Sequence, residues 1–440
     1  MGMIILMAEL VIEIAFATYC VITKSNQGKL RSYLRIGAFA VFILLTLVSV
    51  IQWGSRWYLL AILLLVWAAL GLWALLRKQD QVKPFQARTI LFKAIATLLL
   101  VIIVLTPALI FPQYKLPPMT GKYPVTTVTY TYTDPNRIET FSKTGGNREV
   151  NVEFWFPMQS TGKFPLVVFS HGAFGMKGSN TSTFMDLASN GYVVCSIDHP
   201  YHSLYTRDSN GRTTTIDPAF LQEFMNANNG KYDEKTSFDL EQGWIKLRTA
   251  DINFVLDTIL AKAKDTNSGQ VYQLVNNAKI GLFGHSLGGE SSAQVARERQ
   301  DISAVIDLDA DLGGEYLTYT NGKYVINDRV YPTPILIIFT DELVRRMASI
   351  PDLSNVVASK KVLANAPQAF EIDMPGTNHM SLTDLAVISP LLVKAINSSY
   401  TMVGGYEADP YTVIEKMNSH VLRFFNVFLK NEGSFSATQN

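Results

Sequence analysis

Residues 280–289 read IGLFGHSLGG, and this stretch decides the fold. The apolar run Ile280–Phe283 has the composition of a buried strand, and the residues after the glycine-rich turn have helical composition. A G-x-S-x-G motif between a strand and a helix is typical of a nucleophile elbow, whose tight turn exposes the serine. Ser286 is therefore the predicted nucleophile. The alternative interpretation is a glycine-rich turn in which Ser286 only caps the helix.

Short apolar runs alternate with helical runs on both sides of this motif. Such alternation indicates a mostly parallel sheet with helices on both faces, so we predict an α/β fold for residues 124–440. The expected strands are 125–133, 149–156, 165–170, 192–197, 279–283, 304–308, 334–339 and 369–373, and the expected helices are 182–190, 238–264, 286–299 and 411–430.

Residues 201–237 interrupt the alternation, because they are rich in Asn, Asp, Ser, Thr and Gly. We expect a stretch without secondary structure, of the kind that is either a functional loop or disordered. It follows the carboxyl end of a predicted strand, where ligands bind in open α/β sheets.

A serine is a weak nucleophile without a neighbouring base. After a serine on such an elbow, the acid and then the histidine follow in the chain. His379 lies in a loop directly after a predicted strand and is the predicted base, whereas His420 lies within the closing helix. Asp309 and Asp341 each end a strand between the serine and this histidine, and the residues themselves leave both open as the acid.

Ester or amide cleavage also requires N–H donors for the developing oxyanion. The amide of Leu287, directly after the serine, is one predicted donor. The amide of Ala173, in the glycine-containing loop after the strand 165–170, is the other. His171 precedes that glycine, and we interpret it as a brace for the loop.

The remaining motifs predict no cofactor and no metal. His199 and His202 are three residues apart without further ligands, a weak metal signal, and we interpret them as pocket lining. The sequence contains no phosphate loop, dinucleotide fingerprint or basic nucleic-acid surface. Cys20 and Cys195 lie in separate apolar runs, so no disulfide is expected.

The charge distribution divides the 440 residues into two parts. Only 17% of the residues are charged, against about 25% in ordinary soluble proteins, which argues against disorder, a coiled coil and a nucleic-acid binder. Basic residues dominate residues 1–116, whereas acidic residues are in excess over the rest. A basic, apolar N-terminal part and an acidic, polar C-terminal part indicate a membrane anchor that carries a water-soluble domain.

The N-terminal part contains four apolar runs of about 20 residues, the length that crosses a bilayer. We predict a bundle of four transmembrane helices in residues 1–112 and a linker at 113–123. The four runs are Met3–Thr23, Ile36–Trp53, Trp57–Leu76 and Ile90–Phe111. Glu9 and Glu13 share one face of the first run, and we expect neighbouring helices to satisfy them or the carboxyls to stay protonated; a polar site within the bundle is the alternative.

Basic residues in the loops predict the orientation of the bundle. They concentrate after the first and third runs, so these loops should be cytoplasmic, and the N-terminus and residues after 112 should lie outside. The residues are Lys24, Lys29, Arg31, Arg35, Arg77, Lys78, Lys83 and Arg88.

Four motifs together resemble the platelet-activating factor acetylhydrolases of the plasma and intracellular type II kind, which are α/β-hydrolases. The resemblance covers roughly residues 120–430. The motifs are Phe169-Ser170-His171-Gly172, Gly284 to Gly289 with Leu287 in place of Phe, Leu308-Asp309-Ala310, and Gly376-Thr377-Asn378-His379 followed by Asp384. The resemblance selects Asp309 over Asp341 as the acid.

The resemblance implies a serine hydrolase that cleaves carboxylic esters of small molecules or lipids through Ser286, Asp309 and His379 and an acyl-enzyme. With the bundle, we predict a multi-pass protein of a bacterial cell membrane whose hydrolase domain is extracytoplasmic. A serine peptidase or amidase, and a non-catalytic membrane sensor, are the alternatives. Nothing in the sequence indicates the oligomeric state.

Overall fold

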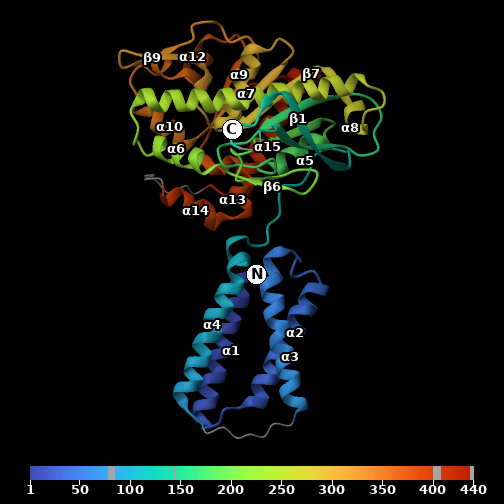
Figure 1. Ribbon diagram of the computed structural model, residues 1–440, viewed down its shortest axis with the longest axis vertical. Coiled ribbons are helices and arrows are strands. Elements are labelled where there is room, and N and C mark those ends of the chain that lie inside the picture. Colours follow the sequence, from blue (N-terminus) through green and yellow to red (C-terminus); the bar gives the residue numbers. More distant parts are fainter. Residues whose placement is uncertain (78–84, 143–144, 400–407, 437–440) are drawn as a thin grey trace. The chain divides into compact units, whose positions relative to one another are not determined.

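The computed structural model describes residues 1–77, 85–142, 145–399 and 408–436 (Figure 1). The chain forms two compact units. The first, here the helical unit, comprises Met1–Lys115 and Val387–Met402, and the second, the sheet unit, comprises Leu116–Ala386 and Val403–Asn440. The described residues 387–399 therefore group with the N-terminal helices, although the domain predicted over 124–440 includes them.

Four long apolar helices make up most of the helical unit, as predicted. Each is long and apolar enough to cross a membrane. Helix α1 packs against α4, and α2 packs against α3. Their bounds are α1 Gly2–Ile22, α2 Gly28–Leu47, α3 Tyr58–Leu76 and α4 Ala87–Ile110. The short α14, Pro390–Ser399, joins them, since the Ser389 hydroxyl before it donates to the carbonyl of Ile110.

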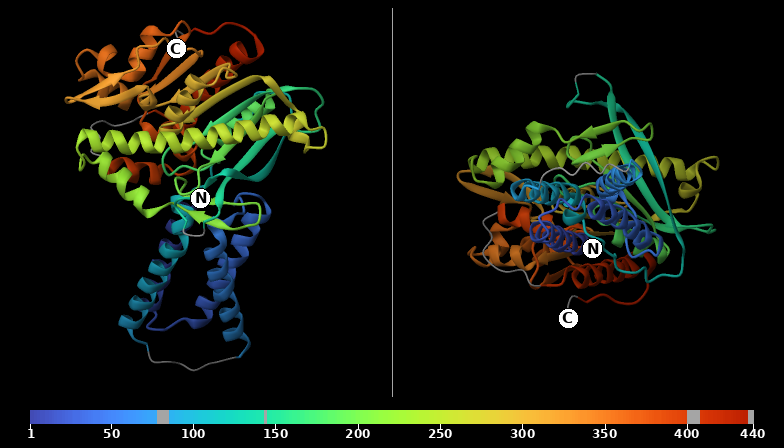
Figure 2. Two further views of the ribbon diagram at one scale, coloured as in Figure 1. Left: turned by 45° about the horizontal axis from the view of Figure 1, so that its top comes forward. Right: turned by 90° about the horizontal axis from the view of Figure 1, so that it is seen from below.

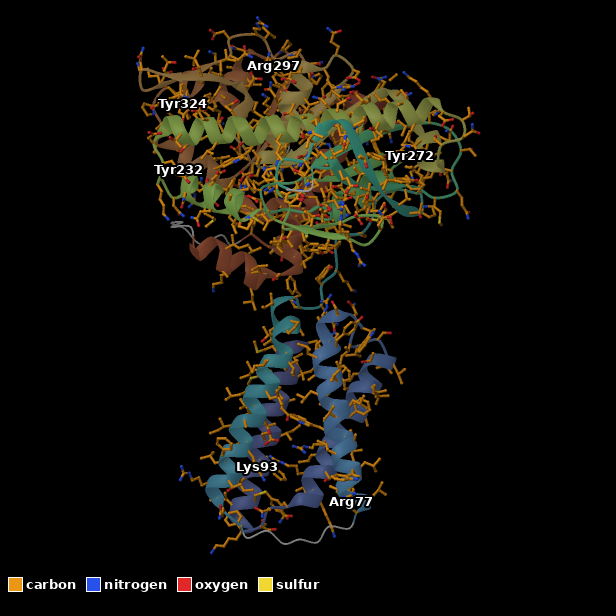
Figure 3. The ribbon with its side chains drawn as sticks, viewed as in Figure 1. Arg77, Lys93, Tyr232, Tyr272, Arg297 and Tyr324 are labelled. Carbon is orange, nitrogen blue, oxygen red and sulfur yellow. The ribbon has the colours of Figure 1, made fainter. Side chains whose placement is uncertain are left out.

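An ion pair lies inside this unit. Arg31 of α2 donates to Glu13 of α1 over 2.8 Å, and its guanidinium lies 4.6 Å from the ring centroid of Phe16. A neighbouring helix thus satisfies Glu13, as expected. Arg77 and Lys93 lie at one end of the unit (Figure 3), and Lys78 and Lys83 lie outside the described residues.

An eight-stranded sheet organises the second unit, in the order β1-β2-β4-β3-β7-β8-β11-β12. Strand β2 runs antiparallel to β1 and β4, and every pairing from β4 to β12 is parallel. The predicted mostly parallel sheet is therefore confirmed. The strands are β1 Val125–Ile138, β2 Asn147–Pro157, β3 Phe164–Ser170, β4 Val193–Asp198, β7 Val275–His285, β8 Ala304–Leu308, β11 Ile335–Thr340 and β12 Ala369–Met374.

Helices cover both faces of the sheet because its strands are apolar on both sides. Helices α7 (Glu234–Lys264) and α9 (Leu287–Glu298) cover one face, and α7 crosses it at full length (Figure 2). Helices α5 (Thr181–Ser189) and α15 (Pro410–Lys430) cover the other. In β7, Leu282 joins the core beneath α7, whereas the Phe283 ring lies 6.0–6.1 Å from those of Phe184 and Phe425 on the opposite helices.

The expectation of an unstructured 201–237 segment is wrong. It contains the hairpin β5 (Tyr205–Arg207) and β6 (Thr213–Thr215), and then helix α6 (Pro218–Asn228). The Asp217 carboxylate caps α6 by accepting from the Phe220 amide, and Phe220 is buried. A cap and one buried aromatic side chain thus order a segment whose composition is polar.

Further short elements were not predicted; η1 lies between α2 and α3, and the others connect or follow strands of the sheet unit. They are α8 Gln270–Gln273, β9 Tyr316–Thr320, β10 Lys323–Ile326, α10 Asp341–Ala348, α11 Leu353–Val356, α12 Ala358–Asn365 and α13 Leu385–Ile388, with 3-10 turns η1 Ser55–Trp57, η2 Gly313–Glu315 and η3 His379–Leu382.

Candidate active site

The turn between β7 and α9 holds Ser286 in an unusual backbone conformation, with φ 53° and ψ −132°. A positive φ is strained for serine and persists only where the surroundings impose it. Here the Ser286 amide donates to the carbonyl of Leu308 on the neighbouring strand, and its carbonyl accepts from Gly289. The side chain is partly exposed between buried neighbours, it does not cap α9, and its hydroxyl forms no hydrogen bond with any described residue.

Three glycines allow this turn, because no side chain fits at their positions. A Cβ on Gly284 would lie 2.3 Å from backbone atoms of Gly288, and a Cβ on Gly288 would lie 2.0 Å from the carbonyl oxygen of Ser170. A Cβ on Gly289 would lie 1.8 Å from a carboxylate oxygen of Asp307. The start of α9 therefore packs directly on the end of β3 and on β8.

Asp309 and His379 meet at the carboxyl ends of β8 and β12. The Nδ1 of His379 lies 2.7 Å from Oδ2 of Asp309. The other oxygen, Oδ1, accepts from the amide and the hydroxyl of Thr340, over 2.6 and 2.7 Å. Burial opposes ionisation of Asp309, but His379 and Thr340 outweigh it and hold the pKa of the carboxyl below its usual range. The group is thus a carboxylate that orients the imidazole.

Asp341, the other candidate acid, has different partners. It is the first residue of α10, and it forms an ion pair with Arg345 over 2.8 Å. Its Oδ2 accepts from the amide of Gly376 over 3.2 Å. Asp341 thus supports the backbone of the histidine loop, and no hydrogen bond joins it to the imidazole of His379 among the described residues.

Two residues that the sequence analysis did not assign hold the backbone of His379. Glu342 accepts from the His379 amide over 3.1 Å, and His285 donates through Nε2 to the His379 carbonyl over 2.9 Å. Burial lowers the pKa of His285 to about 3, so the ring is neutral and Nε2 carries its proton. His285 thus contacts the histidine loop, and no local motif indicates this contact.

The loop after β3 lies against the elbow. A Cβ on Gly172 would lie 2.8 Å from Nδ1 of His285 and 3.3 Å from the Cβ of Ser286, so the loop passes too close to the elbow for a side chain at this position. The next amide, that of Ala173, donates to no described group. The side chains of Ala173 and Leu287 join one apolar cluster. Its other members are Phe174, Ile216, Phe220, Phe224, Trp244 and Ile245.

The histidine pair His199 and His202 is buried. His199 bonds to the Ser170 hydroxyl and to the Asp251 carboxylate. The His202 ring stacks on Phe220 with centroids 3.7 Å apart, so it backs one wall of the apolar cluster.

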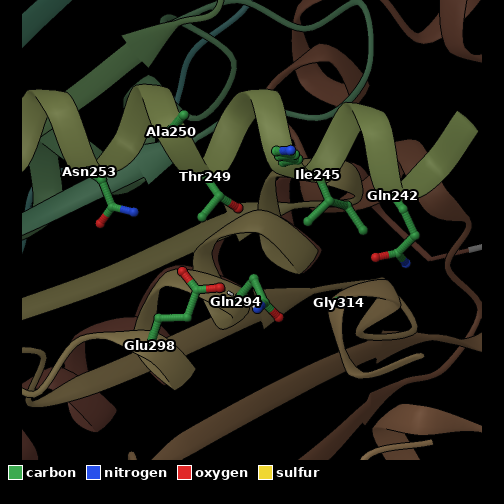
Figure 4. Close-up of a pocket in the computed structure, with 9 residues that line it drawn as sticks. Gln242, Ile245, Thr249, Ala250, Asn253, Gln294, Glu298 and Gly314 are labelled. Carbon is green, nitrogen blue, oxygen red and sulfur yellow. Dashed lines mark hydrogen bonds between the residues drawn. The ribbon is translucent and has the colours of Figure 1, made fainter. Parts of the chain in front are cut away.

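A separate cavity of about 300 Å³ lies between α7 and α9 (Figure 4). Thr249 of α7 and Gln294 of α9 face it, together with other mostly polar side chains. No predicted site residue lines this cavity. It shares one residue, Ile245, with the apolar cluster.

A family model supplies the assignment of the chain. The model described as "Platelet-activating factor acetylhydrolase, isoform II" matches residues 135–439. The chain belongs to this family. The family lies within the α/β-hydrolase superfamily, and the sheet order and helical layers described above agree with that fold.

Individual relatives agree with this assignment. The platelet-activating factor acetylhydrolase of Canis lupus familiaris is 24% identical over 291 residues, which are 62% of this chain and 59% of that protein. The Bos taurus protein of the same name is 24% identical over 296 residues, with the same coverage. The chain thus spans 59% of the length of these relatives.

A solved structure supports the fold. A ferulic acid esterase from Streptomyces cinnamoneus superposes with a TM-score of 0.53 at 20% identity, covering 73% of this chain and 95% of that one.

Asp384 connects the histidine loop to α5. Its carboxylate accepts from the amide and the hydroxyl of Ser182 in the first turn of that helix, and its own amide donates to the Ser179 carbonyl. The side chain is fully buried, and burial raises the pKa of Asp384 to about 6, although the bonds from Ser182 partly offset it.

Asp384 should make the stability of the sheet unit depend on pH. Because the pKa of Asp384 is higher in the folded state than in the unfolded state, proton binding stabilises the folded state at low pH. This stabilisation is lost as pH rises from about 4 through 6. We expect Asp384→Asn, which stays neutral, to gain stability relative to wild type over that range, by about 3 kcal/mol at most. Thermal unfolding at pH 4 to 7.5 measures this, and a difference that is constant with pH would contradict it.

Proposed function

We propose that the protein is a membrane-anchored serine hydrolase that cleaves carboxylic esters, with Ser286 as nucleophile, His379 as base and Asp309 as acid. One observation carries the proposal: the Asp309 carboxylate bonds Nδ1 of His379 at the strand ends next to the elbow of Ser286. Membership of the acetylhydrolase family supports it. No step of the proposed reaction uses a metal or cofactor.

In the proposed reaction, the hydroxyl of Ser286 attacks the ester carbonyl while Nε2 of His379 accepts its proton. The structure has no bond between these two groups, and bonds of this kind often tighten only when substrate binds. Asp309 keeps the proton on Nδ1, so Nε2 is free to act as the base, and it stabilises the imidazolium that forms.

The tetrahedral intermediate carries a negative charge on the former carbonyl oxygen. The amides of Leu287 and Ala173 are the proposed donors to that oxygen. Leu287 begins α9, where the helix dipole also favours an anion. The imidazolium then protonates the alcohol as it leaves, and water releases the acyl group from Ser286 by the same steps in reverse.

The proposed substrates are small esters or phospholipid-type esters. The relatives are named platelet-activating factor acetylhydrolases, and the structural neighbour is named a ferulic acid esterase. The apolar cluster beside Ala173 and Leu287 suits the apolar part of an ester, because most of its members are aromatic or branched.

We also propose that the four helices span a bilayer, with the N-terminus and the sheet unit on the extracytoplasmic side of a bacterial cell membrane. The basic residues at and beside the α1–α2 and α3–α4 connections support this orientation, although Lys29, Arg31 and Arg35 lie on the first turns of α2 and Arg88 on the first turn of α4, not in the predicted loops. Residues 113–123 connect the parts in this scheme, and Thr120 within them bonds to the Asp186 carboxylate of the sheet unit.

Covalent labelling tests the nucleophile. A fluorophosphonate reacts with a serine only where a neighbouring base activates it. We expect wild-type protein to be labelled, Ser286→Ala to be unlabelled, and His379→Ala to be labelled at least 100-fold more slowly. In-gel fluorescence measures the labelled fraction. Ser291, a buried hydroxyl on the same helix, provides the control Ser291→Ala. Labelling that persists in Ser286→Ala would refute the assignment.

Two matched substitutions test the acid. Replacing the orienting carboxylate of a triad by its amide isostere costs about 10⁴-fold in turnover. We expect Asp309→Asn to lose kcat for p-nitrophenyl acetate on that order, and Asp341→Asn to retain most of it, because Asp341 contacts Arg345 and Gly376. The opposite ranking would assign the acid to Asp341.

Tag accessibility tests the orientation. A cysteine at position 118 should react with an impermeant maleimide on intact cells, whereas one at position 26, between α1 and α2, should react only after lysis. Both are made in a background without Cys20 and Cys195, which are buried. The reverse pattern would place the sheet unit in the cytoplasm.

A further inference from the structure

A fully buried guanidinium lies behind the loop that carries Ala173. Arg248 of α7 donates through Nη1 to the carbonyl of His171 and through Nη2 to that of Gly172, the latter over 3.3 Å. Its Nε lies 3.5 Å from Nδ1 of His202. Burial lowers the pKa of Arg248 to about 9, with Asp251 opposing the shift, so the group is charged at neutral pH. A buried charge is costly unless it is well bonded, and here two backbone carbonyls bond it.

These contacts fix the plane of one peptide. The Gly172 carbonyl and the Ala173 N–H belong to the same trans peptide, so they point in opposite directions. Three donors hold the carbonyl: Nη2 of Arg248 over 3.3 Å, Nδ1 of His171 over 2.6 Å and the amide of Gly175 over 3.1 Å. With that oxygen held on the side of α7, the N–H of Ala173 must face the other way, and it has no partner among the described residues.

The protonation of His171 agrees with this role. Burial lowers the pKa of His171 well below its usual value, so the ring is neutral. Its Nδ1 must carry the proton, because a carbonyl can only accept. The bare Nε2 then accepts from the His199 amide over 3.4 Å, and it lies 2.8 Å from the Ser203 hydroxyl, whose single proton it shares with the His199 carbonyl.

A second buried chain of bonds holds the strand just before the loop. The Ser170 hydroxyl bonds to Nε2 of His199 over 2.9 Å, and Nδ1 of that ring bonds to Asp251 over 3.0 Å. Arg148 donates to both oxygens of Asp251 over 2.7 Å. This Ser-His-Asp series is at most 1% exposed, so substrate cannot reach it, and its effect is to fix the end of β3.

We propose that Arg248 is the positioning residue of the oxyanion hole: it orients the Gly172–Ala173 peptide so that the Ala173 amide faces the oxygen of the intermediate. The inference rests on the proposed function and extends it to a residue of α7 that does not touch the substrate. Loss of the guanidinium should leave the peptide held only from within its own loop, by His171 and the Gly175 amide, and the Ala173 amide less well oriented.

The kinetic test compares Arg248→Met with wild type. We expect kcat for p-nitrophenyl acetate to fall about 10- to 100-fold, less than the 10²- to 10³-fold cost of removing an oxyanion donor. KM should stay within about twofold, because the donor acts mainly on the intermediate. Arg248→Lys, which keeps a charge and can reach one carbonyl, should recover part of the rate.

Arg297→Met is the matched control. Arg297 also lies on a helix of the sheet unit, pairs with Glu315 and donates to two backbone carbonyls, those of Arg329 and Val330, but not in the loop of Ala173. We expect it to lower the unfolding temperature and leave kcat per folded protein unchanged. An equal fall of kcat in both variants, or unchanged kcat in Arg248→Met, would overturn the proposal.

Hydrogen exchange separates this proposal from the proposed function. The amides of Phe174 and Gly175 donate to the carbonyls of His202 and Gly172. They should exchange faster in Arg248→Met than in wild type or Arg297→Met, whether or not the protein turns over esters. If the wild-type protein shows no turnover and no labelling but Arg248→Met still exchanges faster, the proposed hydrolase function is refuted and the role of Arg248 in holding the loop stands. Unchanged exchange in Arg248→Met would refute that role.

Discussion

The close approach of α9 to the ends of β3 and β8 is the constraint on which the rest of the site depends. Gly288 places backbone against the Ser170 carbonyl, and Gly289 leaves room for the Asp307 carboxylate. Because no side chain separates these elements, the serine at the start of α9, the loop after β3 and the aspartate after β8 must lie together. The strained backbone of Ser286 follows from the same packing.

Much of the fold could be predicted because the strands of a parallel sheet are almost continuously apolar. Each such strand can be recognised from its own short stretch of sequence. The sheet, its covering helices and the four apolar N-terminal helices were predicted from such stretches. The folding of residues 201–237 could not be predicted, because it depends on Phe220 meeting side chains from α7 and α9. The short connecting elements depend on tertiary contacts in the same way.

The candidate site could be predicted in part for a similar reason. Sequence order assigns Ser286, Asp309 and His379 to strand ends, and the structure brings the last two into a hydrogen bond. Asp309 and Asp341 follow neighbouring parallel strands, so the residues alone do not separate them. What distinguishes them is the positive φ of Asp309 and the donors of Thr340. The bond from Arg248 to Gly172 spans 76 residues, and no local pattern encodes it.

The ion pair between Glu13 and Arg31 has a consequence for biogenesis. In the proposed membrane topology, a charged Glu13 near the middle of α1 would on its own oppose insertion of that helix, on the order of the 2.5–3.5 kcal/mol that a charge costs at a helix centre. Arg31 lies in the first turn of α2, where the cost is smaller. Once paired, the two helices present a single neutral dipole. In that topology, α1 and α2, which are joined by only a short turn, would enter the membrane together as a hairpin that pairs these two charges.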